Sequence, residues 1–316
     1  MRFSYPAIDF DNETILHFKE IFNSGWVSNS DNVRKLEKHF CDLFAVKHAI
    51  ACCNATQGLT IAISAAGWKN LKVAVPAFTW PSTAYAIIHN SCQPVYGDID
   101  PQTWALDLNS VKEKFDAVVP VDIFGNQVEV KADGLAIIYD AAHSYGLAKL
   151  GKRGLAEVVS MSHTKYPTAS EGGIILTNDD RLAERATEER RLAARMSEFN
   201  SIIGLNSVRK YDYFKKHRKA IIDRYLNEIK VPFSTQKIIS NTNNSVFAIL
   251  LDEKIRDKIA TYLRDKLDLE VKIYYEPLVP GLPNTDYVYK RILALPTHIK
   301  MPEILEKVIA GINQFA

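Results

Sequence analysis

Residues 135–143 read Leu-Ala-Ile-Ile-Tyr-Asp-Ala-Ala-His, and residues 158–165 read Val-Val-Ser-Met-Ser-His-Thr-Lys. Each stretch begins with a short apolar run, which is typical of a strand buried on both faces of a parallel sheet. Each run leads to a side chain that can do chemistry, Asp140 in the first and Lys165 in the second. Ligands of open α/β sheets bind beyond the carboxyl ends of the strands. The two stretches therefore predict a sheet that brings Asp140 and Lys165 to one crevice.

Similar runs recur along the first half of the chain, at residues 48–54, 72–78, 94–100, 117–124 and 173–178. Segments that favour helix lie between several of them, and we expect helices over residues 56–66, 82–90 and 103–115. Alternation of strand and helix predicts right-handed crossovers and a mostly parallel seven-stranded sheet with helices on both faces. The link between residues 163 and 173 is too short for a crossover, so one of the last two strands should be antiparallel.

The second half of the chain has a different pattern. Residues 180–195 are charged and favour helix, and residues 197–227 predict a long helix interrupted near Gly204. A second set of elements follows, with strands over 244–251 and 269–275 and helices over 253–267 and 302–315. We therefore predict an α/β fold with two domains, a large one over residues 1–210 and a smaller C-terminal α+β one over residues 211–316.

Composition excludes several classes of protein. The 316 residues are 47% hydrophobic and 24% charged, with a net charge of +2, as expected of a globular chain with a substantial core. The charge balance gives no support to nucleic-acid or membrane binding. The four cysteines form no CxxC pair, which favours reduced thiols over a metal site or a disulfide framework. The N-terminus has no apolar signal region, and no apolar run reaches the roughly 18 residues that span a bilayer, so we expect a cytoplasmic protein.

Two other predicted strands end in segments that can bind a ligand. Residues 54–58 read Asn-Ala-Thr-Gln-Gly before a helical pattern, and hydroxyls and N–H groups at a helix N-terminus bind anions. The alternative is a helix cap by Asn54 or Thr56, which contributes about 1 kcal/mol. Residues 76–83 contain Phe78 and Trp80, which can stack on a planar ring or serve as core aromatics.

The strand-end residues combine into one kind of site. A half-buried Asp140 requires a cationic partner, although a surface aspartate is the alternative. A desolvated Lys165 amine can form a Schiff base with a carbonyl cofactor, although most lysines are solvated. Lysine, carboxylate, phosphate-binding helix terminus and stacking aromatic are the parts that hold pyridoxal phosphate. All of these residues lie at strand ends. This shared position favours a pyridoxal phosphate site over a separate structural role for each residue.

With these residues in place, the sequence resembles the DegT/DnrJ/EryC1/StrS family of pyridoxal-phosphate-dependent sugar aminotransferases, which have the fold type I architecture. The most specific segments are Asp140-Ala141-Ala142-His143, residues 160–165 and Glu171-Gly172-Gly173. Further similarity covers most of the chain, at residues 24–27, 33–37, 54–56, 76–83, 94–100, 119–125, 195–198, 275–277 and 293–298.

The resemblance implies a role for each site residue. Lys165 looks like the Schiff-base lysine and proton carrier, Asp140 like the partner of the pyridine nitrogen, and His143 like the residue near the ring hydroxyl. The remaining implied cofactor residues are the stacking Trp80 and three phosphate ligands, Thr56, the backbone of Gln57, and Ser160.

The resemblance also implies a reaction and an assembly. An amino donor, glutamate, would supply the amine, and a nucleotide-linked keto-sugar would accept it. The pattern in residues 160–165 is more similar to members that act on dTDP-4-keto-6-deoxy sugars. Homodimers with active sites at the subunit interface are implied as well.

The chain departs from the family pattern in one region and at two positions. Only residues 178–194 separate Thr177 from Arg195, where relatives have a longer excursion. Ala193 stands where relatives often have an asparagine that reaches the neighbouring subunit's phosphate, and Asp122 stands where many have histidine. These differences leave two alternatives open: a weakened or inactive paralogue with a binding or regulatory role, and a pyridoxal-phosphate enzyme for another ketone. The retained Lys165 argues against the branch that carries histidine there.

Overall fold

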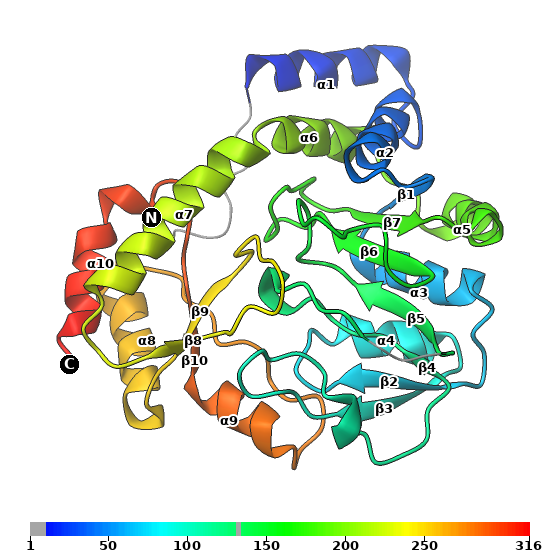
Figure 1. The fold of residues 1–316 in the computed structure, drawn as a ribbon. Helices are drawn as coiled ribbons and strands as arrows, with labels where there is room; N and C mark the ends of the chain where they lie inside the picture. Colours follow the sequence, from blue (N-terminus) through cyan, green and yellow to red (C-terminus); the bar gives the residue numbers. More distant parts are fainter. Residues whose placement is uncertain (1–10, 131–133) are drawn as a thin grey trace.

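The structure is a computed structural model that describes residues 11–130 and 134–316. Its centre is a seven-stranded sheet with the strand order β1-β7-β6-β5-β4-β2-β3 (Figure 1). The strands are β1 (His48–Cys52), β2 (Lys72–Pro76), β3 (Gln93–Gly97), β4 (Ala117–Val118), β5 (Ala136–Asp140), β6 (Ala156–Ser160) and β7 (Gly173–Thr177). The predicted mostly parallel seven-stranded sheet is confirmed.

β7 is the strand that runs antiparallel to the other six. It pairs with β1 on one side and β6 on the other, both antiparallel, whereas β2, β3, β4, β5 and β6 pair in parallel. The prediction that one of the last two strands is antiparallel is confirmed. Because β1 and β6 point the same way, the carboxyl ends of β1, β5 and β6 meet at one edge of the sheet.

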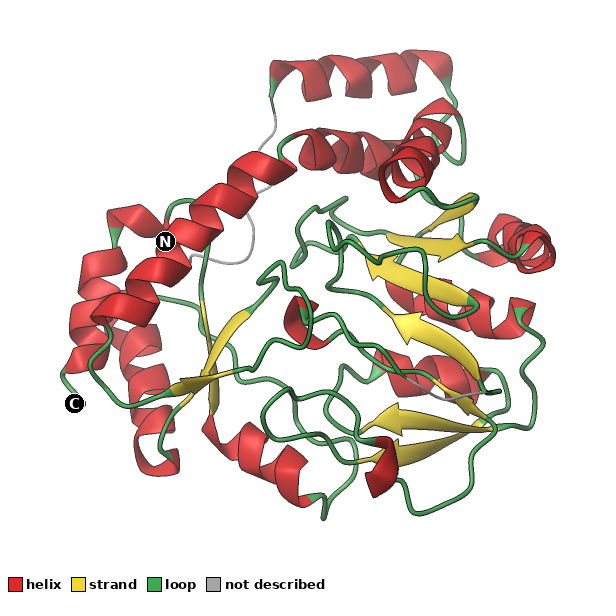
Figure 2. Ribbon diagram, in the orientation of Figure 1, coloured by secondary structure: helices red, strands yellow, loops and turns green. Residues whose placement is uncertain are grey.

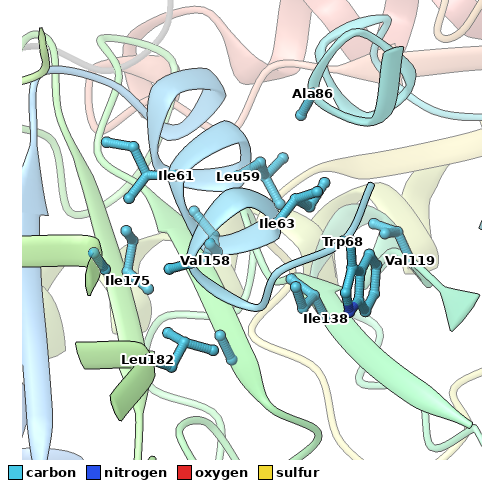
Figure 3. Packing of buried hydrophobic residues seen from close by; sticks show 14 of the residues in the cluster. Leu59, Ile61, Ile63, Trp68, Ala86, Val119, Ile138, Val158, Ile175 and Leu182 are labelled. Carbon is cyan, nitrogen blue, oxygen red and sulfur yellow. The ribbon is translucent and has the colours of Figure 1, made fainter. Parts of the chain in front are cut away.

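Helices cover both faces of the sheet (Figure 2). One layer contains α3 (Ala55–Ala65), α4 (Ser82–His89) and α5 (Asp180–Ala193). In this layer Leu59, Ile61 and Ile63 of α3 pack with Val158 and Ile175 of the sheet (Figure 3). Over the other face lie α2 (Asp31–Phe44) and α6 (Glu198–Arg209), with α1 (Asn12–Ser24) outside them. The apolar strands are therefore buried on both sides, as their composition predicts.

The predicted helix over residues 103–115 is wrong. The segment contains only a short 3₁₀ turn, Leu108–Ser110, and Ile99 forms a β-bridge with Leu106. The Asp100 carboxylate accepts hydrogen bonds from the N–H groups of Gln102 and Thr103, at 3.1 and 2.7 Å. A local side-chain to backbone bond of this kind competes with helix formation.

The predicted long helix over residues 197–227 is two helices, and the break lies at Lys210 instead of Gly204. α6 ends at Arg209, and α7 (Tyr211–Glu228) follows directly. Gly204 lies inside α6, where an added Cβ would be 3.2 Å from the side chain of Leu36. The glycine therefore permits close packing of α6 on α2.

The C-terminal part has a sheet and a core of its own. β8 (Ser234–Thr235), β9 (Phe247–Leu250) and β10 (Ile292–Leu295) form an antiparallel sheet in the order β10-β9-β8. Its helices are α8 (Glu253–Leu267), α9 (Pro283–Arg291) and α10 (Leu305–Asn313). The strand predicted over 269–275 forms only one bridge, Lys272 with Ala294. α7 begins at Tyr211, and the division into residues 1–210 and 211–316 stays a prediction.

All four cysteines have free thiols, and Cys52 and Cys92 are buried. Over residues 11–130 and 134–316, no helix has both the length and the apolarity to cross a bilayer.

Candidate active site

The carboxyl edge of the large sheet gathers most of the predicted site residues. β5 ends at Asp140 and β6 ends at Ser160, and the loop after β6 leads to Lys165. His143 lies three residues beyond Asp140 on the same edge. The topology therefore places an amine, an imidazole and a carboxylate at one edge of the sheet.

Lys165 and His143 are in direct contact. Lys165 Nζ is hydrogen-bonded to His143 Nε2, and His143 Nδ1 accepts the backbone N–H of Phe124 at 3.1 Å. A neutral imidazole that accepts at Nδ1 carries its proton on Nε2. The Nε2–H group therefore faces Lys165 and donates to Nζ when that amine has lost its proton.

The charge states of this pair follow from burial. Desolvation lowers the pKa of Lys165 to about 8, against an opposing effect of the Asp140 charge. The pKa of His143 is lowered well below its usual value by burial and by the positive charges of Lys165 and Arg218. A neutral imidazole beside an amine that loses its proton near pH 8 is suited to nucleophilic and proton-transfer chemistry.

Asp140 is a buried carboxylate, 4% exposed. Its oxygens accept hydrogen bonds from Thr83 Oγ1 at 2.7 Å and from the N–H of Ala142 at 3.1 Å. Burial raises its pKa, although both hydrogen bonds oppose this. In the part of the chain that the structure describes, no lysine or arginine forms an ion pair with it. A buried carboxylate of this kind is matched to a cationic ligand group.

A second corner of the site lies at the start of α3. Ser160 and Cys52 flank Gly173 across the sheet, and a Cβ on Gly173 would be 2.6 Å from the backbone N of Ala55. Only glycine lets the start of α3 sit this close to the strand that joins β1 and β6. The hydroxyls of Thr56 and Ser160 thus belong to one corner of the sheet edge.

The helix cap uses one of the groups that the sequence assigned to a ligand. Asn54 is the N-cap of α3, and its Oδ1 accepts the N–H of Gln57 at 2.8 Å. The first intrahelical bond runs from the N–H of Gly58 to the carbonyl of Asn54. The N–H groups of Ala55 and Thr56 precede that bond and lie at the positive end of the helix dipole.

Trp80 is the most exposed of the predicted site residues. Its side chain is 60% exposed, and its ring is in edge contact with Tyr275 at a centroid distance of 6.3 Å. In the same segment, Thr83 contacts the site directly, because its hydroxyl donates a hydrogen bond to Asp140.

Three contributors were missed in the sequence. Thr83 lies in the 76–83 segment, but nothing there indicated that its hydroxyl bonds Asp140. The Phe124 N–H orients His143, and Asn243 donates to the His143 carbonyl at 2.6 Å. Backbone donors and partners 100 residues apart leave no pattern in a single sequence.

Asp122 belongs to a buried ion cluster behind the site. Arg153 makes two hydrogen bonds to the Asp122 carboxylate, at 2.9 and 2.6 Å, and its Nε donates to Glu157 at 3.0 Å. Ser144 also donates to Asp122. We call Asp122, Arg153 and Glu157 the buried triad. The triad gives Asp122 a structural role and anchors the turn that presents the Phe124 N–H.

Comparison with known proteins agrees with this geometry. A family model described as the DegT/DnrJ/EryC1/StrS aminotransferase family matches residues 9–313. The spore coat polysaccharide biosynthesis protein SpsC of Bacillus subtilis (strain 168) is 26% identical over 363 aligned residues, covering 95% of this chain and 93% of SpsC.

Solved structures have the same fold. DesI, whose crystal structure was determined in the presence of its TDP-sugar product, aligns with a TM-score of 0.83 at 27% identity, covering 97% of this chain and 90% of DesI. Helicobacter pylori PseC, an aminotransferase involved in the biosynthesis of pseudoaminic acid, aligns with a TM-score of 0.86 at 21% identity. That alignment covers 99% of this chain and 98% of PseC.

Proposed function

The chain belongs to the DegT/DnrJ/EryC1/StrS aminotransferase family, and on that premise we propose that it transfers an amino group from glutamate to a nucleotide-linked keto-sugar. Members of the family are pyridoxal-phosphate-dependent sugar aminotransferases. The observation that carries the proposal for this chain is the contact between Lys165 and His143 beside the buried Asp140.

The residues present fit pyridoxal phosphate. Asp140 is a buried carboxylate without a directly bonded ion-pair partner among the described residues, and a protonated pyridine nitrogen would supply one. Thr56, Ser160 and the first N–H groups of α3, at the corner that Gly173 opens, suit the phosphate. We assign Lys165 to the cofactor's aldehyde carbon, His143 to the ring hydroxyl and Trp80 to the ring face, and we keep the Gln57 backbone as a phosphate ligand.

The bound cofactor would supply an electron sink for the carbon that loses its proton. Lys165 does the proton chemistry in this proposal: Nζ takes a proton from the α-carbon of glutamate and later delivers one to the sugar carbon that receives the amine. His143 holds Nζ in place through Nε2–H, and the Phe124 N–H fixes the tautomer that makes this possible. Thr83 keeps the Asp140 carboxylate oriented.

The substrate class is the finer part of the proposal. DesI was crystallised with a TDP-sugar product, which supports a dTDP-4-keto-6-deoxy sugar as the first acceptor to test. Another ketone remains the alternative substrate. α5 ends at Ala193, and Arg195 follows almost at once and forms a β-bridge with Cys52. This short connection, where relatives are expected to have a longer loop, supports a weakened or inactive paralogue as the alternative function.

The test is a panel of dTDP-linked and UDP-linked 4-keto-6-deoxy sugars, incubated with the enzyme, pyridoxal phosphate and glutamate. Formation of 2-oxoglutarate together with an amino sugar of the expected mass supports the proposal. Reaction with glutamate but with none of the nucleotide sugars would point to a different ketone. Absence of reaction with glutamate would favour the paralogue.

Attachment of the cofactor to Lys165 should depend on pH with a midpoint near 8. The amine attacks an aldehyde only when it is unprotonated, and burial lowers its pKa to about 8 from 10.5. The attachment rate should rise as pH increases through 8 and then level off. Asp140→Asn removes the charge that raises this pKa, so its midpoint should shift to lower pH. The change in absorbance after apo-protein is mixed with pyridoxal phosphate measures the midpoint for the wild type and for Asp140→Asn. A wild-type midpoint near 10 would contradict the assignment of Lys165 as the lysine that attaches the cofactor.

A homodimer and a cytoplasmic location complete the proposal. Phe22 and Trp26 are 71% and 72% exposed, and large apolar side chains on a surface mark sites of association. These residues support the dimer.

A further inference from the structure

Lys165 lies in the loop that connects β6 to β7, residues 161–172, which we call the lysine loop. The loop is closed by its own backbone, because the N–H of Ala169 bonds the carbonyl of Met161 at 2.8 Å. Such a bond makes the loop compact but does not fix its place over the sheet edge. That place decides where the amine of Lys165 lies relative to His143.

Ser207, in the last turn of α6, makes two of the bonds that hold the lysine loop. Its hydroxyl accepts the backbone N–H of Thr168 at 2.9 Å, and its carbonyl accepts the hydroxyl of Tyr166 at 3.2 Å. All three residues are buried. Tyr166 follows Lys165 directly in the chain. One residue of α6 therefore holds the backbone next to the reactive lysine through two separate atoms.

Asn200, in the first half of α6, makes a third bond to the lysine loop. Its Nδ2 donates to the carbonyl of Ala169 at 2.7 Å, and a carbonyl can only accept, so the amide nitrogen must be the atom that faces the loop. The Asn200 Oδ1 accepts the hydroxyl of Ser197, the N-cap residue of α6, which holds the amide in this orientation. Asn200 and Ser207 are about two helical turns apart, so they share one face of α6.

α6 is itself fixed to α2. Glu198, in the first turn of α6, is 2% exposed. Its carboxylate accepts the backbone N–H groups at the start of α2, those of Ser30, Asn32 and Val33, at 2.6, 2.9 and 3.3 Å. Ser30 is the N-cap residue of α2 but makes no cap bond with its side chain, so Glu198 takes that role at the positive end of the helix dipole. The lysine loop is therefore held by a helix that is anchored in turn.

The amine of Lys165 depends on such a support because the lysine side chain is flexible. Asp140, at the end of β5, and His143 face Nζ, and burial lowers the pKa of Lys165 to about 8 in spite of the Asp140 charge. A lysine loop that moved off α6 would carry Nζ into more solvent. Its pKa would then rise toward 10.5, and the amine would lose its contact with His143.

We propose that Ser207 and Asn200 are positioning residues for amino transfer, an inference that rests on the proposed function. They touch neither cofactor nor substrate. They hold the lysine loop on α6 so that Nζ of Lys165 stays against His143. Positioning of this kind has a large effect on rate, because a displacement of about 1 Å can lower the rate about a hundredfold.

The experiment compares two serine variants of the same helix. Ser207→Ala removes the acceptor of the Thr168 N–H, whereas Ser201→Ala removes another buried hydroxyl that bonds the carbonyl of Glu198 within α6. Trace labelling of the apo-protein with acetic anhydride over a range of pH, followed by peptide mass mapping, measures the pKa of Lys165. Ser207→Ala, and more strongly Asn200→Ala/Ser207→Ala, should raise that pKa from about 8 to about 9 or above. Ser201→Ala should leave it unchanged.

Amino transfer by the loaded enzyme gives a second readout. We expect kcat to fall roughly ten- to a hundredfold in Asn200→Ala/Ser207→Ala. Ser201→Ala should keep the wild-type rate. Ser207→Thr retains a hydroxyl at this position, so it should recover most of the rate and the wild-type pKa of Lys165.

An unchanged pKa of Lys165 in the folded double variant overturns the proposal. An equal rise in Ser201→Ala also overturns it, because any loosening of α6 would then have the same effect. If circular dichroism shows that the double variant is unfolded, Tyr166→Phe decides instead. It keeps the ring, removes the bond to the Ser207 carbonyl and should raise the pKa of Lys165, whereas Tyr213→Phe, on the exposed side of α7, should not. Equal pKa values in these two variants contradict the proposal.

The labelling requires no cofactor, so it separates this proposal from the proposed function. A raised pKa in Ser207→Ala, together with wild-type protein that forms no pyridoxal phosphate adduct at Lys165, supports the role of α6 and contradicts the aminotransferase. Protein that loads at Lys165 and reacts with glutamate, but whose Lys165 has the same pKa in every variant, contradicts the positioning role and leaves the aminotransferase assignment standing.

Discussion

Lys165→Ala is expected to abolish amino transfer. The substitution removes the amine that we propose both attaches the cofactor and moves the proton, and positioned acid–base catalysis alone contributes about 10²–10⁴-fold. The loss in kcat should be at least that large. Release of 2-oxoglutarate from glutamate measures it, and borohydride reduction with peptide mapping should find the cofactor on Lys165 of the wild type only.

Two further variants separate chemistry from folding. Lys152→Ala removes an exposed lysine and should retain wild-type activity. Lys165→Arg keeps a cation beside Asp140 but has no amine to react with an aldehyde, so it should be as inactive as the alanine variant. Activity of Lys165→Ala within tenfold of the wild type, with an unchanged melting temperature, would show that another residue moves the proton.

Arg153→Met is expected to destabilise the protein by about 3–5 kcal/mol, the range for breaking a buried ion pair. Arg153 is 8% exposed, and both of its carboxylate partners are fully buried. Removing the guanidinium leaves Asp122 and Glu157 as two buried negative charges. Urea denaturation at constant m-value measures the free energy of unfolding, and a loss below about 1 kcal/mol would contradict this account.

The pH dependence and a compensated variant provide the controls. Burial raises the pKa of Glu157 and Arg153 opposes this, so without Arg153 that pKa should lie further above the value in the unfolded chain. A carboxyl group whose pKa is raised in the folded state lowers the free energy of unfolding as pH rises. The loss of stability in Arg153→Met should therefore be larger at pH 8 than at pH 5. The triple variant Asp122→Asn/Arg153→Met/Glu157→Gln removes all three charges and should recover most of the loss. Arg224→Met, which breaks an exposed pair with Glu228, should change stability little.

The sequence predicted the parts of the fold and site that depend on local patterns. Buried strands that end in a polar residue located Asp140 and Ser160, because chain direction alone brings those ends to one edge of the sheet. The strand β10 was not predicted, and the break between α6 and α7 at Lys210 was placed at Gly204 instead. The helix predicted over residues 103–115 failed because the Asp100 side chain bonds its own backbone, an interaction that residue periodicity does not register.

Long-range partners were beyond prediction for a different reason. Asn243 meets the carbonyl of His143, and Thr83 meets Asp140, only after the chain has folded. Asp122 had no physical explanation in the sequence, because its partner Arg153 follows 31 residues later on another loop. Single-sequence reasoning therefore selected candidate reactive groups that lie together in the structure and missed the groups that orient them.

The buried triad also restricts how this protein can evolve. A single substitution at position 122, 153 or 157 leaves a buried charge without its counterion, whereas coordinated replacement does not. Replacement of Asp122 alone, by histidine for example, would therefore give a less stable protein. The three positions are therefore energetically coupled, and the coupling extends to the Phe124 turn, whose N–H bonds His143.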